Sequence, residues 1–178
     1  GGELDQRSVL AVGDLRIAAI ATSHDARDPV ALLLDDGCHR AAVCTDTGCI
    51  TRLLEHRLAA CDLLLIEANH DADLLRHGPY PWHLKQRIAS RHGHLGNHQT
   101  AEALARLAWP GLRGVLALHL SQENNHPCLV EETLGQALGA ALPAAAVPRG
   151  EMVRMTLAGS RAVIERRPAP APLRHASR

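Results

Sequence analysis

The chain of 178 residues has almost no aromatic side chains, with two Trp, one Tyr and no Phe. Hydrophobic residues nevertheless make up 46% of it, which is typical of a globular protein and argues against a disordered one. The core must therefore be built from Leu, Ala, Val and Ile. A chain of this length can form one domain with a substantial core and is too short for two.

An excess of charge of one sign is also missing, since 19 Lys and Arg balance 19 Asp and Glu. The total therefore does not indicate a nucleic-acid or membrane partner, although a local basic patch is compatible with it. We find no signal peptide and no apolar run long enough to cross a bilayer. Five cysteines, an odd number without a Cys-x-x-Cys pair, favour a reduced, cytoplasmic chain.

The apolar segments predict four strands, followed by strands that alternate with helices. The first strands are expected at 8–13, 15–22, 29–36 and 40–46, with a hairpin turn at Asp-Asp-Gly, residues 35–37. Later buried strands are expected at 63–69 and 114–120, and amphipathic helices at 49–62, 82–93, 97–109 and 127–142. This order predicts a layered α/β domain with the sheet inside and helices outside.

Polar side chains follow four of the predicted strands and fill one loop before a helix. They are His24, Asp25 and Asp28; Asp46 and Thr47; Glu67, Asn69, His70 and Asp71; His119; and, in the loop, His92, His94 and Asn97. Strand ends at one edge of an α/β sheet converge on a common space. His and Asp are ligands for Zn²⁺ or a similar ion, and two such ions would support hydrolysis of a phosphodiester or an amide.

Each of these residues also has a purely structural alternative. A lone histidine after a strand is more often a hydrogen-bonded part of the fold, Asp46 could shape a turn, and Asp71 and Asn97 could cap helices. Glu67 is harder to explain in this way, because a carboxylate that ends a run of apolar residues needs a partner. Five coincident polar ends favour a site over five unrelated structural roles.

Four segments of the chain resemble the metallo-β-lactamase fold hydrolases, in particular the YycJ/WalJ/VicX-like branch. They are "SHDARDPV", "TDTG", "IEANHDADLLRHGPYPWHLKQRIASRHGHLGN" and "LHLSQENN". The resemblance implies an α/β fold, the metallo-β-lactamase-like αββα sandwich, here N-terminally incomplete. Residues 1–150 would form this partial domain, and residues 151–178 a terminal strand followed by a disordered tail.

The same resemblance assigns roles to the polar residues. His24, Asp46 and His119 would be metal ligands, with Asp46 bridging two divalent ions, Zn or Mn. His94, oriented by Glu67, would assist at the scissile phosphate, so that His94, Glu67 and Asp46 form the catalytic group. The residues expected to line the substrate site are Asn69, His70 and Asn97. Where this chain has Gly96 the relatives have Ser, which would loosen the start of the following helix.

The family's His-x-His-x-Asp-His motif does not occur in these 178 residues. We therefore expect a fragment or a degenerate homologue with impaired activity, because three ligands shared by two ions are too few.

The resemblance implies a metal-dependent phosphodiesterase or nuclease, most similar to a DNA exonuclease, that uses a metal-activated hydroxide. Its substrate would be DNA rather than RNA, and no membrane partner is expected. Basic residues that could contact phosphates, or simply form a solvated helix face, are Arg76, Lys85, Arg87 and Arg91. The alternatives are a non-catalytic homologue acting through protein contacts and a lactam or thioester hydrolase of the same fold. A homo-oligomer also remains open.

Overall fold

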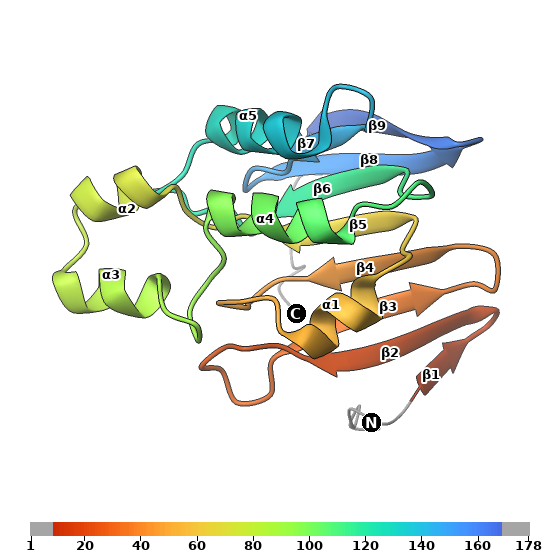
Figure 1. The fold of residues 1–178 in the computed structure, drawn as a ribbon, viewed down its shortest axis with the longest axis horizontal. Coiled ribbons are helices and arrows are strands. Elements are labelled where there is room, and N and C mark those ends of the chain that lie inside the picture. The colour runs from red at the N-terminus through yellow and green to blue at the C-terminus, as the bar shows by residue number, and fades with distance from the viewer. Residues whose placement is uncertain (1–8, 169–178) are drawn as a thin grey trace, which may run out of the picture.

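The computed structural model describes residues 9–168, which form a seven-stranded sheet, five helices and a separate two-stranded sheet. The strands of the large sheet lie in chain order (Figure 1). They are β1 (Val9–Val12), β2 (Leu15–Ala21), β3 (Val30–Asp35), β4 (Arg40–Cys44), β5 (Leu63–Glu67), β6 (Gly114–Leu118) and β7 (Ala144–Ala146). The mixed α/β architecture expected from the sequence is thus confirmed.

The sheet changes from antiparallel to parallel at its centre. Strands β1 to β4 pair antiparallel, and the predicted turn between β3 and β4 is present, with Asp36 Oδ1 accepting from the backbone N–H of Cys38 and His39. Strands β4 to β7 pair parallel, because α1 (Arg52–Leu58), α4 (Asn97–Leu107) and α5 (Pro127–Leu138) return the chain to the same end of the sheet. The carboxyl ends of β4, β5 and β6 therefore lie at one edge.

Helices α1, α4 and α5 cover one face of the sheet (Figure 1). Alternate strand residues such as Leu64, Ile66 and Val115 pack there against Leu54 and Leu104, and all of these are at most 2% exposed. The buried core cluster of the described residues contains only aliphatic side chains and two cysteines, as the scarcity of aromatics predicted.

Two short helices, α2 (Ala72–His77) and α3 (Trp82–Ile88), lie beyond the carboxyl ends of β5 and β6 (Figure 1). The apolar pattern did not predict helix α2, because six residues are too few to show a helical period. Asp71 caps the start of this helix, as one structural alternative expected, because its carboxylate accepts from the backbone N–H of Asp73 and Leu74.

The predicted helices end earlier than the apolar pattern indicated. Helix α1 stops at Leu58, just before Ala60, whose φ of 60° is left-handed, and α5 stops before Gly139, whose φ is 72°. Helix α4 is capped by Gly96, which corrects the alternative of an Asn97 cap. The Asn97 side chain instead exchanges hydrogen bonds of 2.9 Å with Asn125 in the interior.

The chain continues after β7 into the hairpin of β8 (Glu151–Ala158) and β9 (Arg161–Pro168). This hairpin joins the main body where the Ala162 backbone N–H donates to the carbonyl of Arg113. The tail expected to be disordered begins at Glu165, but residues 165–168 form the end of β9, and its remainder lies outside the described residues. The domain boundary near residue 150 stays a prediction. Within residues 9–168, no helix is long and apolar enough to cross a membrane.

Candidate metal centre

Three polar residues meet at the carboxyl edge of the parallel strands. Asp46 follows β4, Glu67 ends β5 and His119 follows β6, and the strand register aligns these ends. The loop before α4 adds His94, and the loop after β2 adds His24. The rings of His24 and His94 lie 4.9 Å apart, and those of His94 and His119 lie 5.1 Å apart.

The backbone is left-handed at Asp46 and His119, with φ angles of 54° and 59°. Only a few per cent of non-glycine residues adopt such angles, and they concentrate at functional sites. Neighbouring side chains hold both turns, since Thr22 Oγ1 donates to the Asp46 carbonyl at 2.7 Å and Asn69 Nδ2 to the His119 carbonyl at 2.8 Å. The sharp turn after β6 is what places the His119 side chain at the edge of the sheet.

Glu67 is the centre of the hydrogen-bond network and is 0% exposed. Its Oε1 lies 2.9 Å from Nδ1 of His94 and 2.6 Å from Nδ1 of His119. Its Oε2 accepts from the backbone N–H of Thr47 at 3.1 Å and of Leu95 at 3.2 Å. Because an ionised carboxylate can only accept, both imidazoles must donate their Nδ1 protons to it.

The network keeps Glu67 ionised. Burial alone would raise the pKa of Glu67, but the hydrogen bonds from His119, His94 and the Thr47 N–H outweigh it and lower the pKa to about 2. The hydrogen bond to Glu67 likewise raises the pKa of His119. The sequence left the partner of the Glu67 carboxylate open, and the structure shows two, His94 and His119.

The distances from carboxylate oxygens to histidine nitrogens show that Glu67 and Asp46 have different roles. One donor atom each from Asp46, Glu67, His94 and His119 lie within 4.8 Å of one another. Two ligands of a tetrahedral Zn²⁺ would lie roughly 3.3 Å apart, so the Glu67 distances of 2.6 and 2.9 Å are those of hydrogen bonds. Glu67 thus orients the two histidines, a carboxylate–histidine pairing common around metals.

Asp46 is the carboxylate that is free to bind an ion. Its Oδ1 lies 3.6 Å from Nδ1 of His119 and 4.0 Å from Nδ1 of His94, beyond hydrogen-bonding distance, and its side chain is 47% exposed. Because Glu67 holds the Nδ1 protons, Nε2 of each of these rings keeps its lone pair. Carboxylate oxygens and imidazole nitrogens are the donor types that a divalent ion takes in proteins.

His24 lies at the margin of this group. Its Nδ1 accepts a hydrogen bond from the Ala26 backbone N–H at 3.0 Å, so the neutral ring carries its proton on Nε2, 3.9 Å from Asp46 Oδ1. Of the three ligands expected from the sequence, the structure groups Asp46 and His119 tightly and places His24 beside them. Among the described residues, these groups do not provide three ligands for each of two ions.

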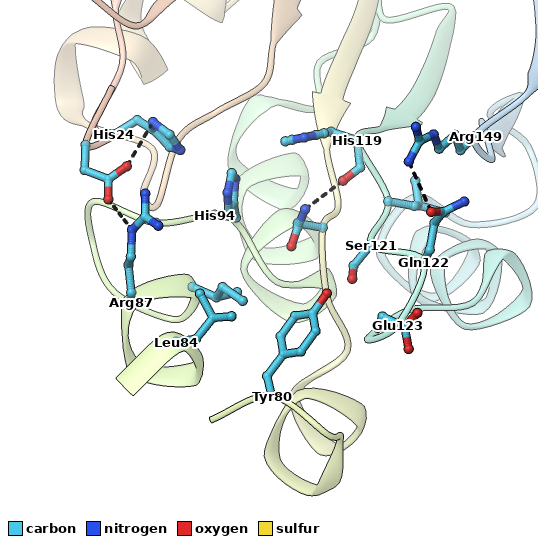
Figure 2. Close-up of a pocket in the computed structure, with 15 residues that line it drawn as sticks. His24, Tyr80, Leu84, Arg87, His94, His119, Ser121, Gln122, Glu123 and Arg149 are labelled. Carbon is cyan, nitrogen blue, oxygen red and sulfur yellow. Dashed lines mark hydrogen bonds and ion pairs between the residues drawn. The ribbon is translucent and has the colours of Figure 1, made fainter. Parts of the chain in front are cut away.

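A cavity of about 660 Å³ opens in front of the histidines. Figure 2 shows His24, His94 and His119 along one side of it, with Tyr80, Arg87 and Arg149 around the rest. Arg87 pairs with Asp25, and Arg149 donates to Gln122 Oε1 at 3.1 Å.

Tyr80 and Arg149 were not expected at the site. They come from loops before α3 and after β7, and no local sequence pattern marks them.

The three residues expected to bind substrate are placed differently. Asn69 lines this cavity, as expected, and also anchors the His119 turn. The other two, His70 and Asn97, are 4% and 5% exposed and line smaller cavities instead. Their role in substrate binding stays a prediction.

Comparisons with known proteins identify the family of this chain. Residues 2–120 match the family model described as Beta-lactamase superfamily domain. The chain is 31% identical over 140 residues to the exodeoxyribonuclease YycJ of Bacillus anthracis, covering 75% of this chain and 53% of that protein. It is 39% identical over 131 residues to the exodeoxyribonuclease WalJ of Streptococcus pneumoniae D39, covering 72% of this chain and 48% of that protein. The chain thus spans about half the length of these curated relatives.

Solved structures with little sequence identity share the fold. The metallo-β-lactamase fold protein YhfI of Bacillus subtilis superposes with a TM-score of 0.60 at 18% identity, covering 80% of this chain and 51% of that one. Zn²⁺-bound PqqB of Methylobacterium extorquens superposes with a TM-score of 0.53 at 20% identity, covering 80% of this chain and 48% of that one. With the family match and the YycJ and WalJ similarity, the resemblance seen in the sequence is confirmed: the chain belongs to the β-lactamase superfamily domain family and has the metallo-β-lactamase fold.

Proposed function

We propose that this chain is part of a metal-dependent exodeoxyribonuclease that hydrolyses phosphodiester bonds of DNA. Similarity to two proteins named as exodeoxyribonucleases supports the substrate class. The observation that carries the proposal is the buried Glu67 carboxylate, which holds the Nδ1 protons of two histidines beside the partly exposed Asp46 carboxylate. A hydrophobic core has no need of such an arrangement, whereas a metal-dependent hydrolase does.

The metallo-β-lactamase fold implies divalent metal binding, and the residues present fit an ion. Asp46 and His119 would hold it, with His24 beside them, and Asp46 is the candidate to bridge two ions in a complete site. Zn or Mn is the proposed metal. When bound, it supplies a Lewis acid that makes water nucleophilic at neutral pH and offsets charge on the phosphate.

The chain's own residues position and transfer protons. Glu67 fixes the tautomer of both rings, so that Nε2 of His119 is unprotonated and available as a ligand. His94 can hold a proton at Nε2 while Glu67 stabilises the charged ring, and can deliver it to the leaving oxygen. Glu67 is therefore a positioning residue, and His94 is the group that touches the reacting phosphate.

The cavity offers cations for the substrate backbone. Arg87 and Arg149 both line it, and each keeps donors beyond the one bound to Asp25 or Gln122. Guanidinium groups bind phosphate oxygens through paired N–H donors, which suits a DNA strand entering the site.

A reduced, cytoplasmic compartment fits this proposal. All five cysteines are free, and burial raises the pKa of Cys44 to about 12 and that of Cys61 to about 11, which leaves both unreactive.

The direct test is digestion of an end-labelled single-stranded DNA with Mn²⁺ or Zn²⁺ added. We expect mononucleotides to be released, and the release to stop with EDTA or in Asp46→Asn. The matched control is Asp28→Asn, whose side chain is 88% exposed in the loop that carries His24.

Two other outcomes would overturn the proposal. Hydrolysis of a chromogenic lactam or thioester without hydrolysis of DNA would favour another hydrolase of this fold. No hydrolysis of any of the three substrates would favour a non-catalytic homologue.

A further inference from the structure

A second cavity, of about 370 Å³, lies on the other side of helix α3. Its lining residues are His70, Ala72, Leu75, Arg76, Trp82, Lys85, Gln86 and Ala89. Residues Leu84, Arg87 and Ile88 of the same helix segment line the main cavity. Helix α3 is therefore a shared wall between the candidate metal centre and this cavity, whose volume is within the usual range for ligand sites.

Trp82 gives the cavity an exposed aromatic surface. Its side chain is 68% exposed, the largest value among the exposed large hydrophobic residues described. The other tryptophan, Trp109, is fixed by a hydrogen bond from its Nε1 to the Cys61 carbonyl at 2.8 Å. Trp82 makes no such side-chain hydrogen bond within residues 9–168, and the fold does not need a large apolar ring in solvent. An exposed ring beside small apolar residues is a platform for a flat ligand.

The rim of the cavity is cationic. Lys85 Nζ donates to the Arg76 carbonyl at 2.7 Å, which joins α3 to α2 and holds the two cations together. Asp73 lies 3.9 Å from the Arg76 guanidinium, but both side chains are more than two-thirds exposed and solvent screens the pair. The described lining residues include these two cations and no carboxylate, so the rim favours an anionic ligand.

The inner wall carries a polar atom without a partner. His70 is 4% exposed, and its Nδ1 makes no hydrogen bond within the described part of the chain. Burial lowers the pKa of His70, so the ring is neutral. Because that nitrogen is itself buried, His70 gives the cavity a neutral inner wall, with no exposed donor or acceptor at Nδ1.

We propose that this cavity binds a nucleobase of the DNA strand whose end is cleaved at the candidate metal centre. The inference rests on the proposed function and adds a second contact to it. The base would stack on Trp82 against the neutral His70 wall, while Arg76 and Lys85 contact the adjoining phosphate. Stacking platforms beside cations are the usual means of binding single strands. An α-helix with side chains is about 10–12 Å wide, so the strand would have to cross about this width between the two sites.

Tryptophan fluorescence tests the stacking directly, because the chain contains only two tryptophans. The probe is an oligothymidylate of about eight nucleotides, added in EDTA so that no cleavage occurs. We expect quenching in Trp109→Phe, where Trp82 is the remaining indole, and none in Trp82→Phe. Trp82→Ala should weaken binding by about tenfold. Removing a positive charge from the rim, in Arg76→Gln or Lys85→Gln, should also weaken binding of the oligothymidylate. Arg52→Gln, which removes a charge from the exposed surface of α1, should leave binding unchanged.

Cleavage rates separate this inference from the proposed function. Trp82→Ala should slow cleavage of the oligothymidylate and leave hydrolysis of bis(4-nitrophenyl) phosphate unchanged, because that ester is too short to span α3. Binding without any change in Trp82 fluorescence, or no binding, would overturn the inference even if the small ester is hydrolysed. If neither substrate is hydrolysed, the proposed function fails, and the fluorescence titration still decides whether the cavity binds a base.

Discussion

Replacing Glu67 with Gln tests whether this carboxylate organises the candidate metal centre. Glutamine keeps the shape of the side chain but offers one acceptor oxygen and an NH₂ group in place of two acceptor oxygens. The native carboxylate receives four donors, two imidazole N–H groups on Oε1 and two backbone N–H groups on Oε2. In Glu67→Gln, the NH₂ must face one of these pairs.

Either orientation of the amide has a cost that the structure sets. If the NH₂ faces the backbone N–H of Thr47 and Leu95, two buried donors lose their acceptor, at roughly 1–3 kcal/mol each. If it faces His94 and His119, both rings must move their proton to Nε2, which in His119 is the nitrogen that an ion needs. The pKa of Glu67 gives a cost of similar size. Its fall from 4.5 to about 2 corresponds to roughly 3 kcal/mol of free energy in favour of the charged form.

We expect Glu67→Gln to lower the free energy of unfolding by about 3 kcal/mol, or to weaken Zn²⁺ binding by about 10- to 100-fold, or both. Urea unfolding followed by circular dichroism measures the first, and titration calorimetry the second. Glu55→Gln is the control, because Glu55 is a surface residue bound to Arg106 and its loss should change stability by less than ~1 kcal/mol. The reasoning is refuted if Glu67→Gln matches Glu55→Gln in both measurements.

Two further predictions concern the same network. The lowered pKa of Glu67 means that its contribution to stability is present above pH 4.5 and lost as the pH falls through about 2, so the difference between the parent and Glu67→Gln should shrink over that window. Urea unfolding at several pH values checks this, and a constant difference would speak against it. Asn125→Asp removes the Nδ2 donor to the Ala68 carbonyl and to Asn97 Oδ1 and sets a carboxylate beside both acceptors. It should cost roughly 2–4 kcal/mol, and an unchanged urea midpoint would contradict that.

The sequence predicted the strands and the polar groups at their ends well, because both are local features. A run of apolar residues that ends on Glu67 already implies a buried carboxylate that needs a partner. The partners themselves depend on tertiary structure, since Oε1 receives His94 from a loop and His119 from the next strand. The resemblance to a family predicted the His94 pairing, and the parallel order of β5 and β6 adds His119.

Other features of the site could not be predicted in this way. Tyr80 and Arg149 reach the cavity from loops about seventy residues apart in sequence, and no periodicity connects them. His24 was expected as a ligand, but the short-range bond from the Ala26 N–H to its Nδ1 decides which nitrogen carries the proton. Asn97 has the residue type of a helix cap, yet its pairing with Asn125 across the fold places the cap at Gly96.

The most direct test of the account is the metal content per chain, measured by elemental analysis after dialysis against Zn²⁺ or Mn²⁺ without a chelator. The account predicts about one ion per chain, because Asp46 and His119, with His24 beside them, offer donors of the types that a divalent ion takes. It also predicts loss of that ion in Asp46→Asn and His119→Ala, and its retention in Asp28→Asn. A parent chain without metal, or equal metal content in all four proteins, would contradict the account.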